Sequence, residues 1–124
     1  KTPLAQARGL GSAKDGVKHW WMQRLTSIPL VFLFFYFVGQ MPRMATANRD
    51  IFIDWMQRPA NGVAAILFVL CAFYHACLGM EEIITDYLPH PGAKIIAVVI
   101  NKLFFFVLAV TSLYAIIRIN FGTI

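Results

Sequence analysis

The chain has 124 residues, which is enough for one domain, and 59% of them are hydrophobic while only 14% are charged. A soluble domain usually carries about 25% charged residues, so the composition excludes an ordinary soluble domain. The net charge of +5 does not indicate nucleic-acid binding, because much of it stands before the first apolar run, at Lys1, Arg8, Lys14, Lys18 and Arg24.

Residues 1–20 are polar and contain several glycines, and we expect them to form an N-terminal tail at the membrane surface. No small-residue cleavage site follows the first apolar run, which argues against a signal peptide. Basic residues before a first membrane helix mark the cytoplasmic flank. We therefore expect the N-terminus on the cytoplasmic or matrix side, with Trp20 and Trp21 at the interface.

Three apolar runs follow, at residues 25–42, 59–80 and 95–117, and only Lys102 interrupts the last of them. A helix that crosses the hydrocarbon layer needs about 20 apolar residues. Strands of a membrane barrel would be shorter and would alternate apolar with polar residues. The runs predict an all-α membrane protein with three transmembrane helices, at about residues 22–42, 61–87 and 93–120, in a single membrane-anchor domain over residues 1–124.

The connections between the runs differ in character. "DIFIDWMQRP" in the first connection predicts a short interfacial helix anchored by Trp55. "LPHPGAK" predicts a tight turn on the inner side, because proline cannot continue a helix, and His90 is expected to be a surface residue of that turn. Cys71 and Cys77 are six residues apart on one helix, so they are expected to be unbridged apolar side chains.

Polar residues recur on one face of the second helix, in the stretch "HACLGMEEIITDY". His75, Gly79, Glu82 and Asp86 lie at spacings of 4, 7 and 11, which return to one helix face. Asp86 is about 16 Å from His75 along the helix axis. If Asp86 lies at the inner rim, His75 lies near the middle of the bilayer.

An ionisable residue at that depth normally faces a partner helix, a cavity or a cofactor. Three interpretations of His75 remain open on spacing alone. It can be a structural residue hydrogen-bonded to another helix, an axial haem ligand with Gly79 admitting the flat macrocycle, or part of a proton relay with Glu82 and Asp86.

A second polar group is expected where the first helix begins and the second ends. Arg24, Asp86 and Tyr87 can cluster there, and with Thr26 and Ser27 they can line a pocket for a lipid-soluble molecule with polar oxygens. The alternative is that Arg24 reaches lipid phosphate and Tyr87 lies in the aromatic belt.

These residues resemble those of a known family. "HACLGMEEIITDY" is similar to the His-Ala-x-x-Gly-x-x-x-x-x-x-Asp-Tyr motif of the small hydrophobic membrane-anchor subunit of succinate dehydrogenase, or complex II. "GSAKDGVKHWWMQRLTSI" resembles the segment before the first helix of that subunit. Similar length, three spans and an inside N-terminus extend the resemblance over essentially the whole chain.

The resemblance implies a subunit that is not catalytic alone. A larger cytochrome b anchor subunit, an iron–sulfur subunit and a flavoprotein would be its partners, beside membrane lipid and without nucleic acid. His75 would be one axial ligand of the haem b iron, with the other from the larger anchor. Tyr87 and Asp86 would form part of the ubiquinone site, and Arg24 would contact a haem propionate or polarise Tyr87. FAD and the iron–sulfur clusters would belong to partner subunits.

Some positions depart from the family pattern. Relatives often have a histidine near position 18, where this chain has Lys18, so the resemblance implies a cofactor-binding role only for the adjacent His19. Lys102, Glu81 and Glu82 match no motif, and we expect Lys102 to snorkel or meet a partner helix and the glutamates to be solvated.

Several functions remain open from the sequence. The first is an anchor of succinate:quinone oxidoreductase in a bacterial inner membrane, in preference to a mitochondrial one. The same architecture would serve a quinol–fumarate reductase. A small proton-coupled transporter that uses Glu82 or Asp86 in a homo-oligomer, and a scaffold without cofactor, are the alternatives from other classes.

Overall fold

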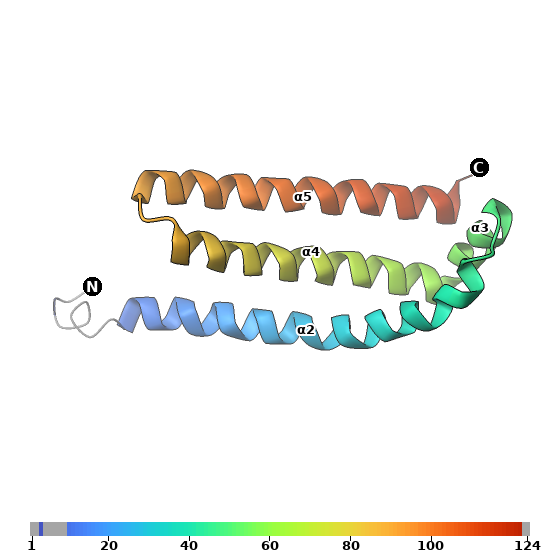
Figure 1. The fold of residues 1–124 in the computed structure, drawn as a ribbon, viewed down its shortest axis with the longest axis horizontal. Helices are drawn as coiled ribbons and strands as arrows, with labels where there is room; N and C mark the ends of the chain where they lie inside the picture. The colour runs from blue at the N-terminus through green and yellow to red at the C-terminus, as the bar shows by residue number, and fades with distance from the viewer. Residues whose placement is uncertain (1–2, 4–9, 123–124) are drawn as a thin grey trace.

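Three long helices run antiparallel to their chain neighbours, and a short helix lies at one end of the bundle (Figure 1). In this computed structural model, residue 3 and residues 10–122 are described, with the side chains of residues 3 and 16–122. The elements are α2 (Leu10–Met44), α3 (Arg49–Gln57), α4 (Pro59–Tyr87) and α5 (Pro91–Phe121). The start of α2 and the α4–α5 turn share one end of the bundle, and α3 and the C-terminus share the other.

Three of these helices are long and apolar enough to cross a membrane: Gly16–Met44 within α2, Pro59–Tyr87 and Pro91–Phe121. Their outward faces carry large exposed hydrophobic side chains, such as Phe32, Phe35 and Phe106. A helix that is apolar on its outer face is suited to lipid and not to water. The expectation of an all-α protein with three transmembrane helices is confirmed.

α2 begins at Leu10, well before the expected start at about residue 22. Hydropathy marks the part of a helix that lies in lipid, and polar residues do not by themselves end a helix. Much of the expected tail at residues 1–20 therefore continues the helix outward. Residues 1–2 and 4–9 of that tail, with the basic residues Lys1 and Arg8, lie outside the described residues, as does the side chain of Lys14.

Proline sets the starts of the other two long helices. Pro59 stands at the first position of α4 and Pro91 at the first position of α5, where the missing N–H costs no helical hydrogen bond. His90 is more than a turn residue, because its Nδ1 accepts a hydrogen bond from the backbone N–H of Ala93 at 3.1 Å. It is therefore the N-cap of α5.

The expected short helix in the first connection is present as α3, capped by Asn48, whose Oδ1 accepts from the N–H of Ile51 at 2.9 Å. The expected role of Trp55 is wrong. Trp55 is 6% exposed and packs with Met56, Ala65 and Ile116, and is not an anchor in the membrane interface. The reason is that α3 folds back onto α4 and α5, which turns its apolar side toward the bundle.

α4 is the central helix, because it packs against both α2 and α5. Polar side chains link it to its neighbours. Asn101 of α5 donates from Nδ2 to the carbonyl of Cys77 at 3.1 Å, and Tyr36 of α2 donates to Asn61 Oδ1. Cys71 and Cys77 are unbridged, as expected.

Candidate functional site

The polar stripe of α4 packs against a matching stripe of α2. Thr26 Oγ1 lies 3.0 Å from His75 Nδ1, and His19 Nδ1 lies 3.2 Å from Glu82 Oε1. Between these pairs, a Cβ added at Gly79 would lie 3.6 Å from Gln23 Nε2. The two antiparallel helices therefore meet in register, and we call these six residues the α2–α4 seam.

The sequence alone identifies the α4 stripe of the seam but not the α2 stripe that faces it. It places Thr26 in a pocket at the membrane rim, and it does not single out Gln23. A signal is present, because positions 19, 23 and 26 have the same helical spacing as positions 75, 79 and 82. Two stripes of equal spacing on neighbouring antiparallel helices can face each other along their length.

His75 is half-buried in the seam, with Nδ1 directed at Thr26. No hydrogen bond to Nε2 is formed by the described residues. The interpretation of a histidine hydrogen-bonded to another helix is thus correct for one ring nitrogen. The second nitrogen keeps its capacity to bind a metal or another group.

Gln23 leaves one polar atom without a partner. Its Oε1 is buried and has no hydrogen bond within the described part of the chain. A buried acceptor without a donor costs about 1–3 kcal/mol. The Gln23 side chain also stands at Gly79, so the space expected for a flat macrocycle at this glycine is taken from the α2 side. A donor for Oε1 would have to come from a molecule outside this chain.

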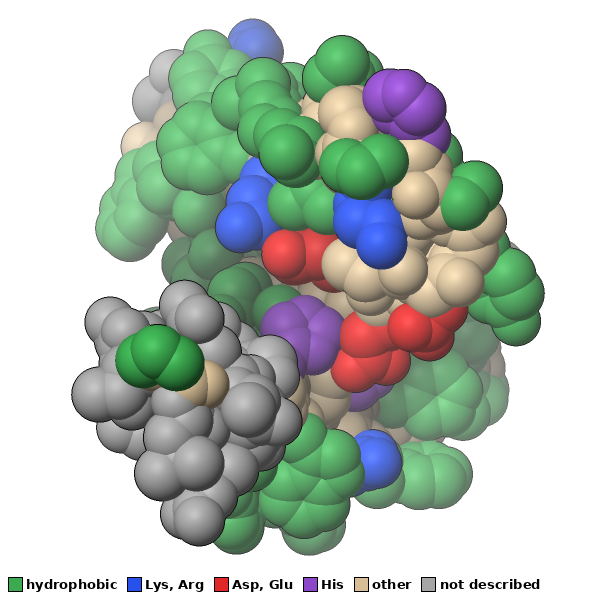
Figure 2. Space-filling model, turned by 90° about the vertical axis from the view of Figure 1, so that its left-hand side faces the viewer, with side chains coloured by type: hydrophobic (Ala, Val, Ile, Leu, Met, Phe, Trp, Pro, Cys, Tyr) green, Lys and Arg blue, Asp and Glu red, His purple; other side chains and the backbone are tan. Residues whose placement is uncertain are grey.

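Charged side chains gather at the end of the bundle where the α4–α5 turn lies (Figure 2). Besides the pair His19–Glu82, Lys102 Nζ of α5 lies 3.7 Å from Glu81 Oε1 of α4. The sequence suggests that both glutamates are solvated. Glu82 is exposed, as expected, although it also pairs with His19. Glu81 is largely covered and pairs with Lys102. Helical side chains lean toward the N-terminus of their helix, and α5 begins at this end, so Lys102 extends toward Glu81.

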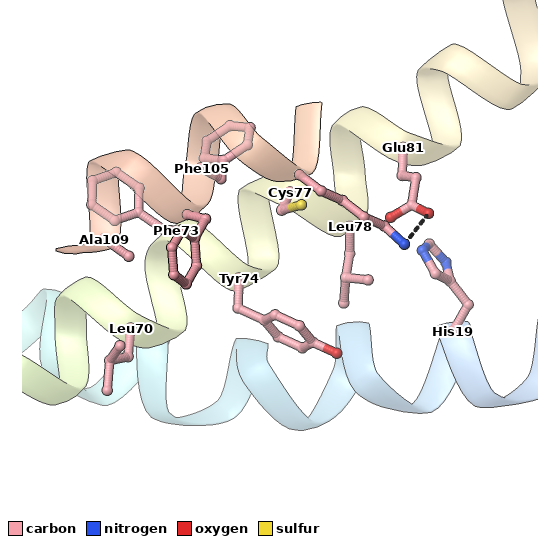
Figure 3. A pocket seen from close by; sticks show the side chains of 11 residues that line it. His19, Leu70, Phe73, Tyr74, Cys77, Leu78, Glu81, Phe105 and Ala109 are labelled. Carbon is pink, nitrogen blue, oxygen red and sulfur yellow. Dashed lines mark ion pairs between the residues drawn. The ribbon is translucent and has the colours of Figure 1, made fainter. Parts of the chain in front are cut away.

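A cavity of about 530 Å³ lies between α4 and α5 beside this charge layer (Figure 3). Its walls are mainly apolar, and the His19 ring points toward the Glu81–Lys102 pair at one end. The lining residues that carry polar atoms are His19, Tyr74, Cys77, Glu81 and Lys102. His75 faces the seam with α2 and is not among the lining residues, whereas His19 belongs both to the seam and to the wall of the cavity.

Arg24 does not join Asp86 and Tyr87. Gln23 lies opposite Gly79 and Thr26 opposite His75, so Arg24 is level with the segment between Gly79 and His75. Asp86 is seven residues beyond Gly79, which is about 10 Å along the axis. The expected cluster of these three residues at one rim is therefore not formed, because α2 begins earlier than expected.

Each of the three has its own surroundings. Arg24 is exposed, with its Cζ 5.3 Å from the centre of the Trp20 ring. Asp86 is exposed and Tyr87 is 80% exposed at the last turn of α4. No ion pair with Arg24 or Asp86 occurs among the side chains of residues 16–122. The side chains of Asp86 and Tyr87 are thus accessible to a further molecule.

The metal-ligating side chains of the site limit which cofactors it can bind. Within the described residues, no group of three or more His, Cys, Asp or Glu side chains could hold a metal ion. One imidazole with a free Nε2 fits a single axial position of a haem, whose iron takes its other nitrogen ligands from the macrocycle. A second axial ligand would have to come from another chain.

Comparisons with known proteins agree with this picture. Residues 1–110 match the model of a family described as "Succinate dehydrogenase/Fumarate reductase transmembrane subunit". Two relatives named "Succinate dehydrogenase hydrophobic membrane anchor subunit" are 34% identical over 84% of this chain and 83% of the Rickettsia bellii protein, and 27% identical over 99% of this chain and 95% of the Paracoccus denitrificans protein.

A third relative of that name, from Rickettsia conorii, is 31% identical over 93% of this chain and 92% of its own length. No solved structure matches the chain significantly. The family model covers far more than half of the 124 residues, and these relatives align over 83% to 95% of their own length. The three apolar helices, the stripe on α4 and these similarities lead to one conclusion: the chain belongs to the succinate dehydrogenase/fumarate reductase transmembrane subunit family.

Proposed function

We propose that this chain is the small membrane-anchor subunit of a succinate:quinone oxidoreductase. Its relatives carry that role in their names, and its three apolar helices suit an anchor. The proposal includes three partners, namely a larger cytochrome b anchor subunit, an iron–sulfur subunit and a flavoprotein. FAD and the iron–sulfur clusters lie in the partners, and this chain holds them at the membrane.

The observation that supports haem binding is the hydrogen bonding of the His75 ring. Its Nδ1 is engaged by Thr26 while Nε2 has no partner among the described residues. We assign His75 as one axial ligand of haem b, with the second from the larger anchor. When bound, the haem supplies a one-electron carrier whose potential depends on its axial ligands and on nearby charges. Arg24, level with the segment between His75 and Gly79, is suited to a propionate, and His19 at the rim supplies a further polar contact.

Tyr87 and Asp86 are assigned to the ubiquinone site. Quinone reduction needs a hydrogen-bond donor at the oxygen that becomes negative and a route for protons from water. Tyr87 offers a phenol O–H and Asp86 a carboxylate, both exposed at the end of α4. The quinone would lie against partner subunits there, with the Tyr87 hydroxyl donating to a carbonyl oxygen and Asp86 passing protons.

The proposed anchor function also implies an orientation of the chain in the membrane. The N-terminal end of α2 and the α4–α5 turn share one end of the bundle, and we place that end on the cytoplasmic side of a bacterial inner membrane. The homologues from Rickettsia and Paracoccus are bacterial. Lys18 and Lys94 also lie toward this end of the bundle. Basic residues that flank membrane helices are enriched on the cytoplasmic side, which supports this placement.

The test is His75→Ala in the purified complex. We expect the b-type reduced-minus-oxidised absorbance to disappear while three other polypeptides still co-purify with the chain. His90→Asn is the matched control, because asparagine retains the N-cap of α5, and its spectrum should be unchanged. A full haem spectrum in the His75→Ala complex would exclude the ligand assignment. Purification of the native chain as a functional homo-oligomer would exclude the anchor.

The reverse direction is the second candidate. The matching family model covers fumarate reductase as well as succinate dehydrogenase, and an anchor with a haem ligand and a quinone site can pass electrons either way. The ratio of succinate oxidation by quinone to fumarate reduction by quinol, measured on one purified complex, decides between them.

A further inference from the structure

The hydroxyl of Thr26 makes more contacts than it has hydrogens. Oγ1 lies 2.8 Å from the carbonyl oxygen of Met22, 3.2 Å from that of Gln23 and 3.0 Å from His75 Nδ1. Thr26 is 9% exposed, so water does not complete this arrangement. A hydroxyl has one hydrogen to donate and two lone pairs to accept with.

The direction of the contact with His75 follows from this count. Carbonyl oxygens only accept, so the hydroxyl hydrogen goes to the backbone of the preceding turn, as threonine commonly does inside helices. If Thr26 instead donated to His75, its oxygen would lie 2.8 Å from the Met22 carbonyl with no hydrogen between them. His75 Nδ1 must therefore carry a hydrogen and donate it to Thr26.

The protonated Nδ1 determines what the other nitrogen can do. In a neutral imidazole only one nitrogen carries hydrogen, so a hydrogen on Nδ1 leaves a lone pair on Nε2. Metal-ligating histidines generally donate their second ring N–H to an acceptor, which fixes the tautomer and the ring orientation and raises the basicity of the ligand. Thr26 stands where that acceptor is required.

We propose that Thr26 is the positioning residue of His75: it holds the imidazole in the tautomer and orientation in which Nε2 binds the haem iron. This rests on the proposed haem ligation. Thr26 acts through His75 and does not touch the iron. Because Thr26 is on α2 and His75 on α4, the α2–α4 seam is also what orients the ligand, so the anchor presents a preformed axial position to a cofactor shared with another chain.

The chain offers a matched control one residue away. Ser27 also has a hydroxyl in the same turn of α2, but its Oγ donates to the carbonyl of Arg24 at 2.7 Å. It makes no hydrogen bond with His75 among the described contacts. Ser27→Ala therefore removes a back-bonding hydroxyl at this depth without removing the acceptor of His75.

The experiment uses the complete purified complex with Thr26→Val, Thr26→Ser and Ser27→Ala. Valine has the shape of threonine without the hydroxyl, and we expect haem retention to weaken by on the order of tenfold. The haem midpoint potential should rise, because a less basic imidazole stabilises the ferric state less. Thr26→Ser, which keeps the hydroxyl, should retain the native haem content and midpoint potential. Ser27→Ala should change neither quantity. If the Thr26→Val complex fails to assemble, Thr26→Ala, which also lacks the hydroxyl, is measured in its place.

The outcomes separate this inference from the proposed function. If Thr26→Val keeps the native haem content and potential while His75→Ala loses the haem, Thr26 is not the positioning residue and the ligand assignment stands. If both variants keep the haem, the ligand assignment itself is wrong. A fall in stability with unchanged potential in Thr26→Val would leave only a packing role, which also overturns the inference.

Discussion

Asn101 in the first half of α5 donates a hydrogen bond to the backbone carbonyl of Cys77 in α4, at 3.1 Å. The Cys77 carbonyl lies within the continuous helix α4 and also accepts the helical hydrogen bond from the following turn. The bond from Asn101 is therefore a second one to this carbonyl and does not break the helix. Asn101 is buried although both helices face lipid on their outer sides. One polar side chain thus joins the two helices where apolar contacts alone would not set their register.

The first prediction concerns this bond. We expect Asn101→Leu to destabilise the α4–α5 pair by about 0.6–2 kcal/mol, the range for a hydrogen bond between membrane helices. Thermal unfolding of the detergent-purified complex measures the loss. Ile100→Leu is the control, because Ile100 is exposed on the adjacent outer face. Equal midpoints for the two variants would show that the bond contributes no stability.

The second prediction concerns the ion pair of Lys102 with Glu81. The Glu81 side chain is 20% exposed and that of Lys102 is 62% exposed, so an unpaired Glu81 costs more than an unpaired Lys102, which can snorkel to the rim. We expect Lys102→Met to destabilise the complex more than Glu81→Gln does. The double variant should be more stable than Lys102→Met alone.

A double-mutant cycle on thermal unfolding midpoints measures this coupling. Exposed pairs contribute roughly 1 kcal/mol or less, and burial of Glu81 places this pair near the upper end of that range. If the two single variants add without coupling, the pair contributes nothing and Lys102 only snorkels.

The three membrane spans could be predicted from the sequence for physical reasons that are local, although the start of α2 could not. Apolar runs of about 20 residues mark spans, and Pro59 and Pro91 mark helix starts, because proline fits only the first turn. The same reasoning finds the stripe of His75, Gly79 and Glu82, since helical period is a property of one segment.

The partners of that stripe could not be predicted in the same way. Which residue of α2 faces His75 depends on where α2 begins and how the connection between the helices is packed. A start expected at residue 22 places Arg24 beside Tyr87, whereas the helix from Leu10 places Arg24 level with the segment between Gly79 and His75, roughly 12–18 Å further along the bundle. Trp55 is misplaced for a similar reason, because the fold-back of α3 is set by contacts with α4 and α5.

The third prediction concerns Trp55. Its Nε1 donates to Gln40 Oε1 at 3.1 Å, and its ring packs against Phe37 with centroids 6.1 Å apart. We expect Trp55→Ala to cost about 3–5 kcal/mol through the cavity that it leaves. Trp55→Phe should cost less, about 1–3 kcal/mol, because it removes the hydrogen bond to Gln40 and only part of the buried ring volume.

The same thermal measurement on the purified complex checks both variants. Phe121→Ala is the control, because Phe121 is 85% exposed at the end of α5. If Trp55→Ala is as stable as Phe121→Ala, then Trp55 lies at the membrane surface as the sequence alone suggests.

The fourth prediction concerns the orientation in the membrane. We expect His90→Cys, in the α4–α5 turn, to react with a membrane-impermeant maleimide only after spheroplasts are opened. Thr46→Cys, between α2 and α3, should react in intact spheroplasts, because the two positions lie at opposite ends of the bundle. The unmodified chain, whose Cys71 and Cys77 lie within α4, provides the background. The opposite labelling pattern would move the proposed quinone site to the other side of the membrane.

The last prediction concerns Tyr87. In Tyr87→Phe the ring remains and only the hydroxyl is lost, so the hydrogen bond to the developing negative charge on the quinone oxygen disappears. Loss of one such donor typically lowers a rate by about 10²–10³-fold. We expect ubiquinone reduction by succinate to fall toward that extent, while succinate oxidation by a soluble dye, which takes electrons before the quinone, stays unchanged. Tyr114→Phe is the control, because Tyr114 is exposed on α5, toward the other end of the bundle. Equal loss of both activities would indicate misassembly, and unchanged quinone reduction would place the site elsewhere.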